Sequence, residues 1–169
     1  MKTLFAFTVA TLGAWAALAA DSNDWPRWRG PHDDGNAASS NLPLEWSDDN
    51  VLWKAPLPGK GCSTPIVWQN RIYLTAPVRG QDGVLAFSAD GKRLWQQTLG
   101  PESKGKHRNG SGSNPSPATD GKAVFVNFKS GNLAALELDG TLRWKLNLVE
   151  RFGADTLYWD YGSSPVLTR

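Results

Sequence analysis

A ten-residue segment of this chain occurs twice, and this repetition limits the folds open to it. Residues 86–95 read AFSADGKRLW, and residues 135–144 read ALELDGTLRW. The copies share four residues at a constant offset of 49 positions, namely Ala86, Asp90, Gly91 and Trp95 in the first and Ala135, Asp139, Gly140 and Trp144 in the second. A fixed period of this length indicates a tandem repeat architecture such as a propeller or a solenoid.

Short runs rich in β-branched and aromatic residues surround both copies. In the first repeat these runs are 64–68, 71–75, 84–88 and 93–98, separated by turn residues at 69–70, 81–83 and 90–91. The second repeat has the same order, with runs at 116–119, 123–128, 133–138 and 142–146. Four antiparallel strands joined by tight turns form one propeller blade. We therefore predict an all-β chain, an incomplete β-propeller of four-stranded antiparallel blades.

A hydroxyl residue followed by proline opens each repeat, at Thr64-Pro65, Ser116-Pro117 and Ser164-Pro165. Proline is tolerated as the first residue of a strand, so each pair predicts the start of an innermost strand. Residues 51–169 should then divide into an outer strand at about 51–57, a blade at about 62–98, a blade at about 114–147 and the start of a next blade at 163–169. Because a propeller has about four to eight blades, we expect these repeats to be the front portion of a longer protein.

Residues 1–20 have the pattern of a secretory signal peptide. Lys2 precedes an apolar run at 4–18 that is too short to favour a membrane span, and small residues follow at 19–20. No cysteine stands at the expected cleavage site, and the lone Cys62 has no intrachain partner. We predict an exported protein, periplasmic or secreted, with no lipid anchor and no membrane span after cleavage.

Residues 21–50 form an extended arm rich in Trp and Pro. Prolines at 26, 31 and 43 argue against a continuous helix. Alternating Trp and Arg could stack on single-stranded nucleic acid, or the tryptophans could pack onto the β-domain as a lid. Lys+Arg 18 against Asp+Glu 16 is too small a positive excess for a nucleic-acid partner, so we favour the lid.

The repeated segment resembles the "tryptophan-docking" motif of the pyrroloquinoline-quinone-type β-propeller repeats, in which Ala and Gly-Lys-x-x-Trp recur on the outer strands. Both copies are one residue shorter in the turn than the usual pattern, and the second has Thr141 in place of Lys. Residues 25–31 and 42–46 further resemble BamB-like secreted members of this family. The resemblance implies a binding or scaffold module in the cell envelope, with a protein or polymer as partner.

Two other functions are compatible with this resemblance. One is a quinone-dependent dehydrogenase whose catalytic blades lie beyond residue 169, and the other is a propeller that binds carbohydrate or another polymer. Pyrroloquinoline quinone and calcium enter only as what the resemblance implies, because the adjacent cysteines and calcium-ligating carboxylates of the dehydrogenases have no match here. We assign no catalytic residue and no metal ligand, and we expect Cys62 to be a small buried hydrophobic residue.

The connections between repeats predict where recognition takes place. Trp95 to Pro117 and Trp144 to Pro165 span 22 and 21 residues, against 12 from Trp53 to Pro65. The first long loop is basic and rich in glycine, and the second is aromatic and acidic. We expect them to lie side by side at one end of the central channel. The candidate ligand or partner residues are His107, Arg108, Asn109, Trp159 and Asp160; the alternative is a solvated loop packed on its neighbour.

Overall fold

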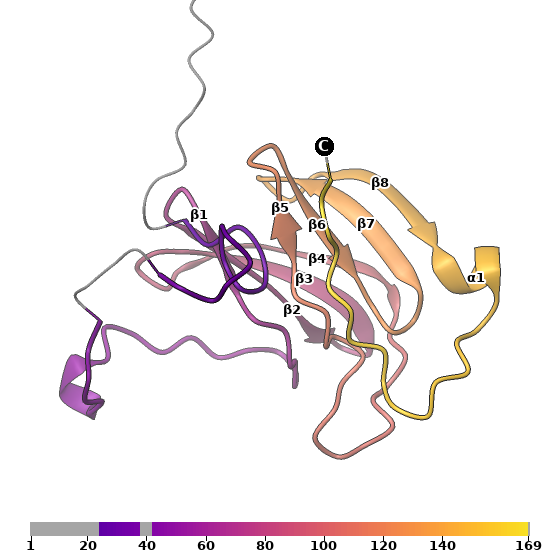
Figure 1. The fold of residues 1–169 in the computed structure, drawn as a ribbon, viewed down its shortest axis with the longest axis horizontal. Coiled ribbons are helices and arrows are strands. Elements are labelled where there is room, and N and C mark those ends of the chain that lie inside the picture. Colours follow the sequence, from indigo (N-terminus) through magenta and orange to yellow (C-terminus); the bar gives the residue numbers. More distant parts are fainter. Residues whose placement is uncertain (1–23, 38–41, 169) are drawn as a thin grey trace, which may run out of the picture.

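The computed structural model describes residues 24–37 and 42–168 (Figure 1). The predicted signal peptide and its cleavage site lie outside these residues. The described chain forms two four-stranded antiparallel sheets, each a meander whose strands are neighbours in sequence order. Among the described residues, none of the helices has the length and apolar character needed to cross a membrane.

The strand bounds agree with two predicted blades. The first sheet contains β1 (Ile66–Trp68), β2 (Arg71–Val78), β3 (Gln81–Ser88) and β4 (Arg93–Pro101). The second contains β5 (Ala118–Thr119), β6 (Ala123–Asn127), β7 (Asn132–Glu137) and β8 (Leu142–Asn147). A 3-10 turn η1 (Asp48–Asn50) and a short helix α1 (Leu148–Phe152) complete the elements. The all-β prediction is confirmed as two sheets consistent with propeller blades, and the described residues close no ring.

The repeated segment adopts the same local structure in both sheets. Ala86 pairs with Trp95 across β3 and β4, and Ala135 pairs with Trp144 across β7 and β8. The ladder register shifts immediately after each Ala. Each connecting turn has its glycine at positive φ, 83° at Gly91 and 93° at Gly140, a conformation that glycine adopts without the steric cost of a Cβ. The sequence period is therefore a structural period.

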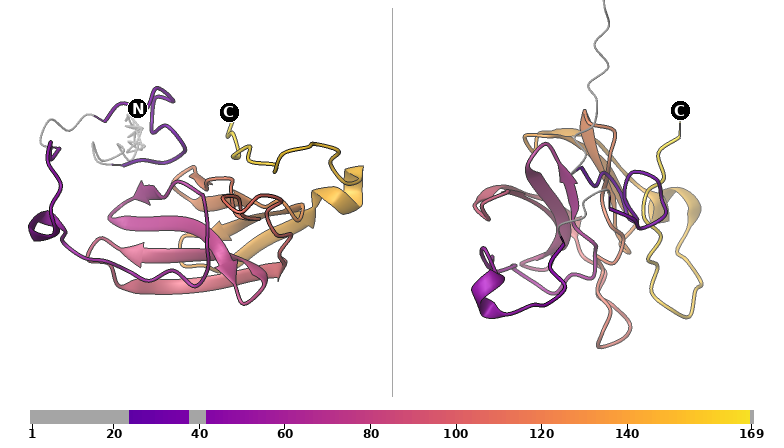
Figure 2. Two further views of the ribbon diagram at one scale, coloured as in Figure 1. Left: turned by 90° about the horizontal axis from the view of Figure 1, so that it is seen from below. Right: turned by 60° about the vertical axis from the view of Figure 1, so that its left-hand side comes forward.

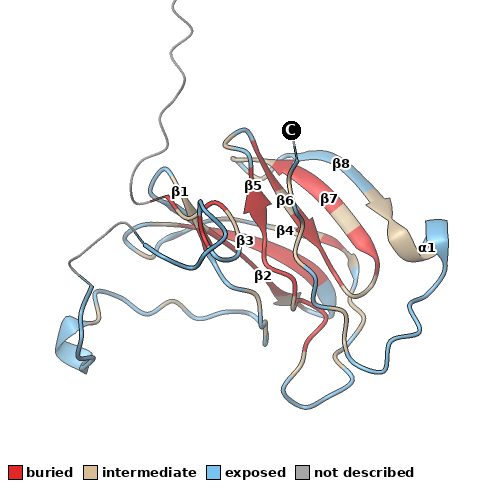
Figure 3. Cartoon of the chain, in the orientation of Figure 1, coloured by how far each residue is buried: buried red, intermediate tan, exposed pale blue. Residues whose placement is uncertain are grey.

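The main hydrophobic core lies between the two sheets (Figure 3). Buried residues from both sheets form one cluster: Ile66, Tyr73, Val84, Ala86, Leu99, Val124, Val126, Phe128, Ala134 and Leu136. The side chains alternate along each strand, so each sheet presents an apolar face to its neighbour. A smaller cluster lies on the other face of the first sheet around Leu74 and Leu85.

Two tryptophans of the first sheet contact turns of the second. Trp95 Nε1 donates to the Leu138 carbonyl oxygen at 3.1 Å, and its ring lies so close to Gly140 that a Cβ there would be 2.7 Å away. The Trp68 ring also lies against a turn glycine of the second sheet, since a Cβ on Gly121 would be 2.6 Å from it, but among the described residues its Nε1 has no hydrogen-bond partner. Glycine at these turns thus admits an indole ring against the backbone.

Residues 51–57 form no strand, in contrast to the outer strand expected there. An outer strand needs a neighbour on its inner side, and the described residues offer none to this segment. Trp53 nevertheless repeats the contacts of Trp95, because its Nε1 donates to the Ala89 carbonyl oxygen at 2.8 Å and its ring covers Gly91. The segment therefore occupies the place of an outer strand without pairing as one.

The strand-opening hydroxyl residues form a repeated contact. Thr64 N donates to Ser116 Oγ at 2.8 Å, and Ser116 N donates to Ser164 Oγ at 3.0 Å. Residues 163–168 therefore contact the start of the second sheet in the same way as residues 115–118 contact the start of the first. They form no strand themselves, so the start of a next blade stays a prediction.

Residues 24–37 of the arm lie beside β1 and β5, the first strands of the two sheets, whereas η1 lies away from both sheets (Figure 2). Trp25 makes an antiparallel bridge with Val67, with N–O distances of 2.8 and 2.9 Å, and Thr119 N donates to the Pro26 carbonyl oxygen. The arm is thus joined to both sheets through its backbone, whereas the Trp25 ring lies over Gly30 of the arm itself, so the lid stays a prediction. Trp28 and Trp46 are 56% and 77% exposed and do not pack as expected.

One predicted turn is wrong. We expected residues 81–83 to form the turn before β3, but the hairpin turns at Arg79 and Gly80, both at positive φ, and Asp82 lies buried within the strand. Its Oδ2 accepts hydrogen bonds from Ser130 Oγ and, at 2.8 Å, from Asn132 Nδ2, so the carboxylate links the two sheets. Within the described ranges, its Oδ1 has no hydrogen-bond partner.

The surroundings of Asp82 disfavour its charge. Burial raises the pKa of the carboxyl above its ordinary value of 3.8, against the opposing effect of the hydrogen bonds from Ser130 and Asn132. The negative charge of Glu102 acts in the same direction as burial, and the positive charge of Lys145 acts against it. The folded protein therefore binds this proton more readily than the unfolded chain.

Acidification should accordingly strengthen the contribution of Asp82 to folding. This contribution is lost as the pH rises through the raised folded pKa and is fully present below 3.8. We expect the difference in unfolding free energy between the native protein and the Asp82→Asn variant to move in favour of the native protein as the pH falls from neutral. Denaturant unfolding over this range tests it, and a difference that does not change with pH would contradict it.

Candidate functional site

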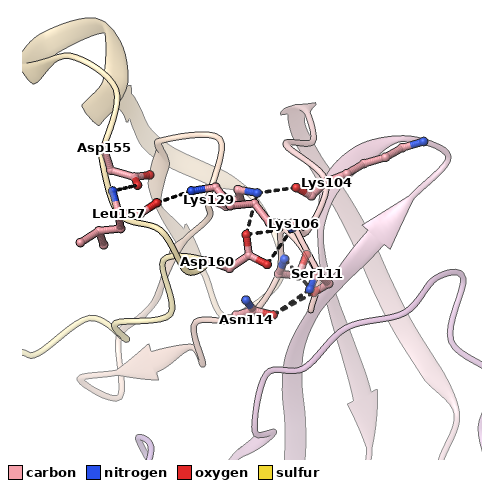
Figure 4. A network of polar contacts seen from close by, with 9 residues as sticks. Lys104, Lys106, Ser111, Asn114, Lys129, Asp155, Leu157 and Asp160 are labelled. Atoms are coloured by element: carbon pink, nitrogen blue, oxygen red, sulfur yellow. Dashed lines mark hydrogen bonds and ion pairs between the residues drawn. The ribbon is translucent and has the colours of Figure 1, made fainter. Parts of the chain in front are cut away.

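The two long loops lie against each other, as the sequence predicts (Figure 4). The first connects β4 to β5, and the second follows α1. Lys106 N donates to both carboxylate oxygens of Asp160, at 3.0 and 2.9 Å, and Lys106 Nζ donates to the Leu157 carbonyl oxygen. The backbone of one loop is therefore fixed by a side chain of the other.

Asp160 also forms a buried ion pair with Lys129, which follows β6. The distance from Lys129 Nζ to Asp160 Oδ1 is 2.7 Å, and the two side chains are only 9% and 8% exposed. Burial by itself would raise the pKa of Asp160, but the hydrogen bonds from Lys129 and Lys106 and the charge of Lys129 outweigh it and hold the pKa below its ordinary value. Lys129 Nζ further donates to the Lys104 carbonyl oxygen at 2.5 Å. Asp160 thus holds the second loop against the first loop and against Lys129.

The first loop is compact because its backbone contacts itself. A Cβ on Gly105 would lie 2.6 Å from the Gly110 carbonyl carbon, and one on Gly112 would lie 2.4 Å from the Ser103 carbonyl oxygen. Lys129 N also donates to the Gly112 carbonyl oxygen at 3.0 Å. The glycines of this loop thus allow backbone segments to approach each other closely.

The three candidate residues of the first loop, His107, Arg108 and Asn109, lie together at its exposed tip. Asn109 N donates to His107 Nδ1 at 3.1 Å, and the Arg108 carbonyl oxygen accepts from Lys60 Nζ. The Asn109 carbonyl oxygen accepts from Cys62 Sγ at 3.3 Å. Cys62 is exposed, so the expectation of a buried hydrophobic residue is wrong, because the segment before β1 runs along the surface beside this loop.

Trp159 lies beside this tip in a group of exposed apolar side chains that the sequence analysis recognised only in part. Leu157, Tyr158 and Trp159 are 55%, 81% and 69% exposed. The rings of Tyr158 and Trp159 meet edge to face, with their centroids 4.9 Å apart and an interplanar angle of 86°. With Lys106, His107 and Asp160 they line an open cavity of about 480 Å³. The signal in the sequence that Leu157 and Tyr158 belong here is the run of consecutive apolar residues before Asp160.

A second cavity, of about 530 Å³, lies where the arm, the second loop and the strand-opening segments meet. It is lined by Trp28 of the arm, by Tyr161 and by the hydroxyl residues that open the strands. Tyr161 Oη accepts from Asn127 Nδ2 at 2.7 Å, so the second loop also closes this cavity. The two loops thus form part of both cavities.

The described residues do not fit a calcium-bound quinone. Within the described ranges, no group of three or more His, Cys, Asp or Glu side chains is placed to hold a metal ion. The buried carboxylates of Asp24 and Asp82 and the ion-paired carboxylate of Asp160 already bind groups of the protein itself.

The chain forms two four-stranded antiparallel sheets in which the repeated Ala–Trp pair has the same register. Tryptophans join the sheets, and long loops connect the repeats. These features define a protein of propeller-blade repeats. Comparison with protein families identifies these repeats. The family described as "Outer membrane protein assembly factor BamB" matches residues 40–168, so the chain belongs to this family of BamB-type PQQ-like repeats. No curated protein matches the chain significantly.

Proposed function

We propose that this protein is exported and serves as a binding or scaffold module of the cell envelope, with its partner bound at the exposed apolar residues of the second loop. The observation that supports this proposal concerns the second loop, whose base is held in place while its apolar tip is exposed. Asp160 is held by Lys129 and by the backbone of Lys106, while Tyr158 and Trp159 next to it are exposed.

Binding of a partner to such a tip costs little conformational entropy. Large aromatic side chains have few rotatable bonds, and a loop held at its base is already ordered before the partner arrives. Exposed Trp and Tyr are the residue types that contribute most to protein interfaces. The signal-peptide pattern of residues 1–20 and the family support the location in the envelope.

The test uses a photo-crosslinking amino acid at Tyr158 in the full chain, expressed in its own envelope. We expect one discrete adduct, and we expect Trp159→Ala to weaken the binding of that partner by about 30-fold, because loss of a central aromatic contact costs about 2 kcal/mol. The same probe at Leu44, which is 97% exposed on the arm, is the control.

Equal labelling from both positions would overturn the proposal. An adduct with a polysaccharide would support binding at this tip with a carbohydrate as the partner. Oxidation of an alcohol or a sugar by the protein supplied with quinone and calcium would instead support the dehydrogenase alternative.

A further inference from the structure

We propose that a third cavity, separate from the aromatic tip, binds a phosphate group. The cavity has a volume of about 440 Å³ and lies where three loops meet. Lys60 comes from the segment before β1, Arg79 from the turn between β2 and β3, and Lys104 from the loop after β4. This proposal is independent of the proposed function.

The charges around this cavity favour an anion. Lys60, Arg79 and Lys104 line it, and Glu102 is the acidic residue among its lining residues. In the part of the chain that the structure describes, none of these three cations forms an ion pair with a carboxylate. Lys60 Nζ donates to a neutral carbonyl oxygen. Three cations and one carboxylate leave the lining with a net positive charge, and an anion would neutralise the resulting positive potential.

The wall of the cavity is held in place by the backbone. Glu102 N donates to the Gly80 carbonyl oxygen at 3.0 Å, which joins the loop after β4 to the turn that carries Arg79. Gly59 lies so close to Pro77 that a Cβ would be 2.5 Å from its carbonyl oxygen, which joins the segment of Lys60 to β2. The three loops are therefore fixed relative to each other before any ligand binds, and little ordering is needed.

The cavity leaves room for an oxyanion beside its cationic side chains. Glycines make up much of its lining, and at Gly80 a Cβ would find no atom within 4 Å, so the space beside Arg79 is open. An arginine guanidinium donates two parallel hydrogen bonds to an oxyanion, and lysines add charge without a fixed geometry. Phosphate, whose doubly charged form has several acceptor oxygens, fits this set of donors.

The phosphate could belong to a soluble molecule or to a lipid headgroup, and the experiment distinguishes these sources. Binding of the full chain to inorganic phosphate and to pyrophosphate is measured by calorimetry at constant ionic strength. Binding to vesicles of phosphatidylglycerol is measured against vesicles of phosphatidylcholine. The variants are Arg79→Ala/Lys104→Ala and, as a control of equal charge change, Lys92→Ala/Lys122→Ala, whose lysines are exposed in other turns.

We expect the native chain and the control to bind at least one of these phosphate probes. The Arg79→Ala/Lys104→Ala variant should bind it at least about tenfold more weakly, since two of the three cationic donors are lost. Binding to vesicles alone would assign the site to a lipid headgroup, and binding in solution alone would assign it to a soluble phosphate. The proposal is overturned if no probe binds, or if both double variants bind as the native chain does.

Discussion

Replacing Trp95 with alanine is expected to lower the unfolding free energy of the chain by about 3 kcal/mol, at the lower end of the range for large aromatic residues in a core. The indole ring packs on the main core, meets the Tyr73 ring with centroids 5.9 Å apart, and donates to the Leu138 carbonyl oxygen. Alanine would remove these contacts and leave a gap between the two sheets over Gly140. The measurement is denaturant unfolding followed by circular dichroism.

Trp144→Ala is the matched control, because Trp144 occupies the same position one repeat later. It is 39% exposed, and its ring contact is with Phe125, with centroids 6.3 Å apart. With less surface removed from water, it should cost about 1 kcal/mol in the 169-residue chain. Equal losses for the two variants would show that the contacts of Trp95 with the second sheet are not what stabilises the pair.

Replacing Lys129 with methionine should lower the unfolding free energy by a similar amount, about 3 kcal/mol. Removal of one member of a buried ion pair leaves the other charge without compensation. Asp160 would keep its hydrogen bonds from Lys106 N but lose the ammonium group 2.7 Å from its Oδ1. The Lys104 carbonyl oxygen would lose its donor as well. The base of both loops is therefore expected to loosen.

The pH dependence provides a second readout for this pair. Because the folded pKa of Asp160 lies below its ordinary value, its ionised form stabilises the protein above that value, and the stabilisation is lost as the pH falls through the folded pKa. Lys129→Met should abolish most of the stabilisation that the native protein loses at acidic pH through Asp160. Lys122→Met, on an exposed turn, should change stability by less than about 0.5 kcal/mol. A Lys129→Met variant as stable as that control would contradict the role of the pair.

Asp82 and Asp160 illustrate which contacts could not be read from the sequence. Both stand in stretches that read as turns or loops, because Asp and Gly are typical of turns. Asp82 is instead buried in β3, since its partners Ser130 and Asn132 come from the neighbouring sheet. Asp160 does lie in the predicted loop, but its ion-pair partner Lys129 comes from a segment that no sequence pattern singles out.

The sequence by itself determined the repeat unit of this protein. The shared positions of Ala86 and Ala135 and of Trp95 and Trp144 predicted paired strands, and the turn glycines predicted the hairpins between them. Strand alternation, turn chemistry and repeat period are local properties, so they can be read from residues close together in the chain.

Only the tertiary structure decided how the repeats contact each other. Trp95 binds a carbonyl 43 residues away, and Lys106 binds a carboxylate 54 residues away. The sequence also left open that Trp53 covers Gly91 while residues 51–57 stay unpaired. Such contacts depend on how one sheet packs on the next, and the energy of that packing comes from burial and charge compensation between distant segments. No local pattern in the chain encodes those pairings.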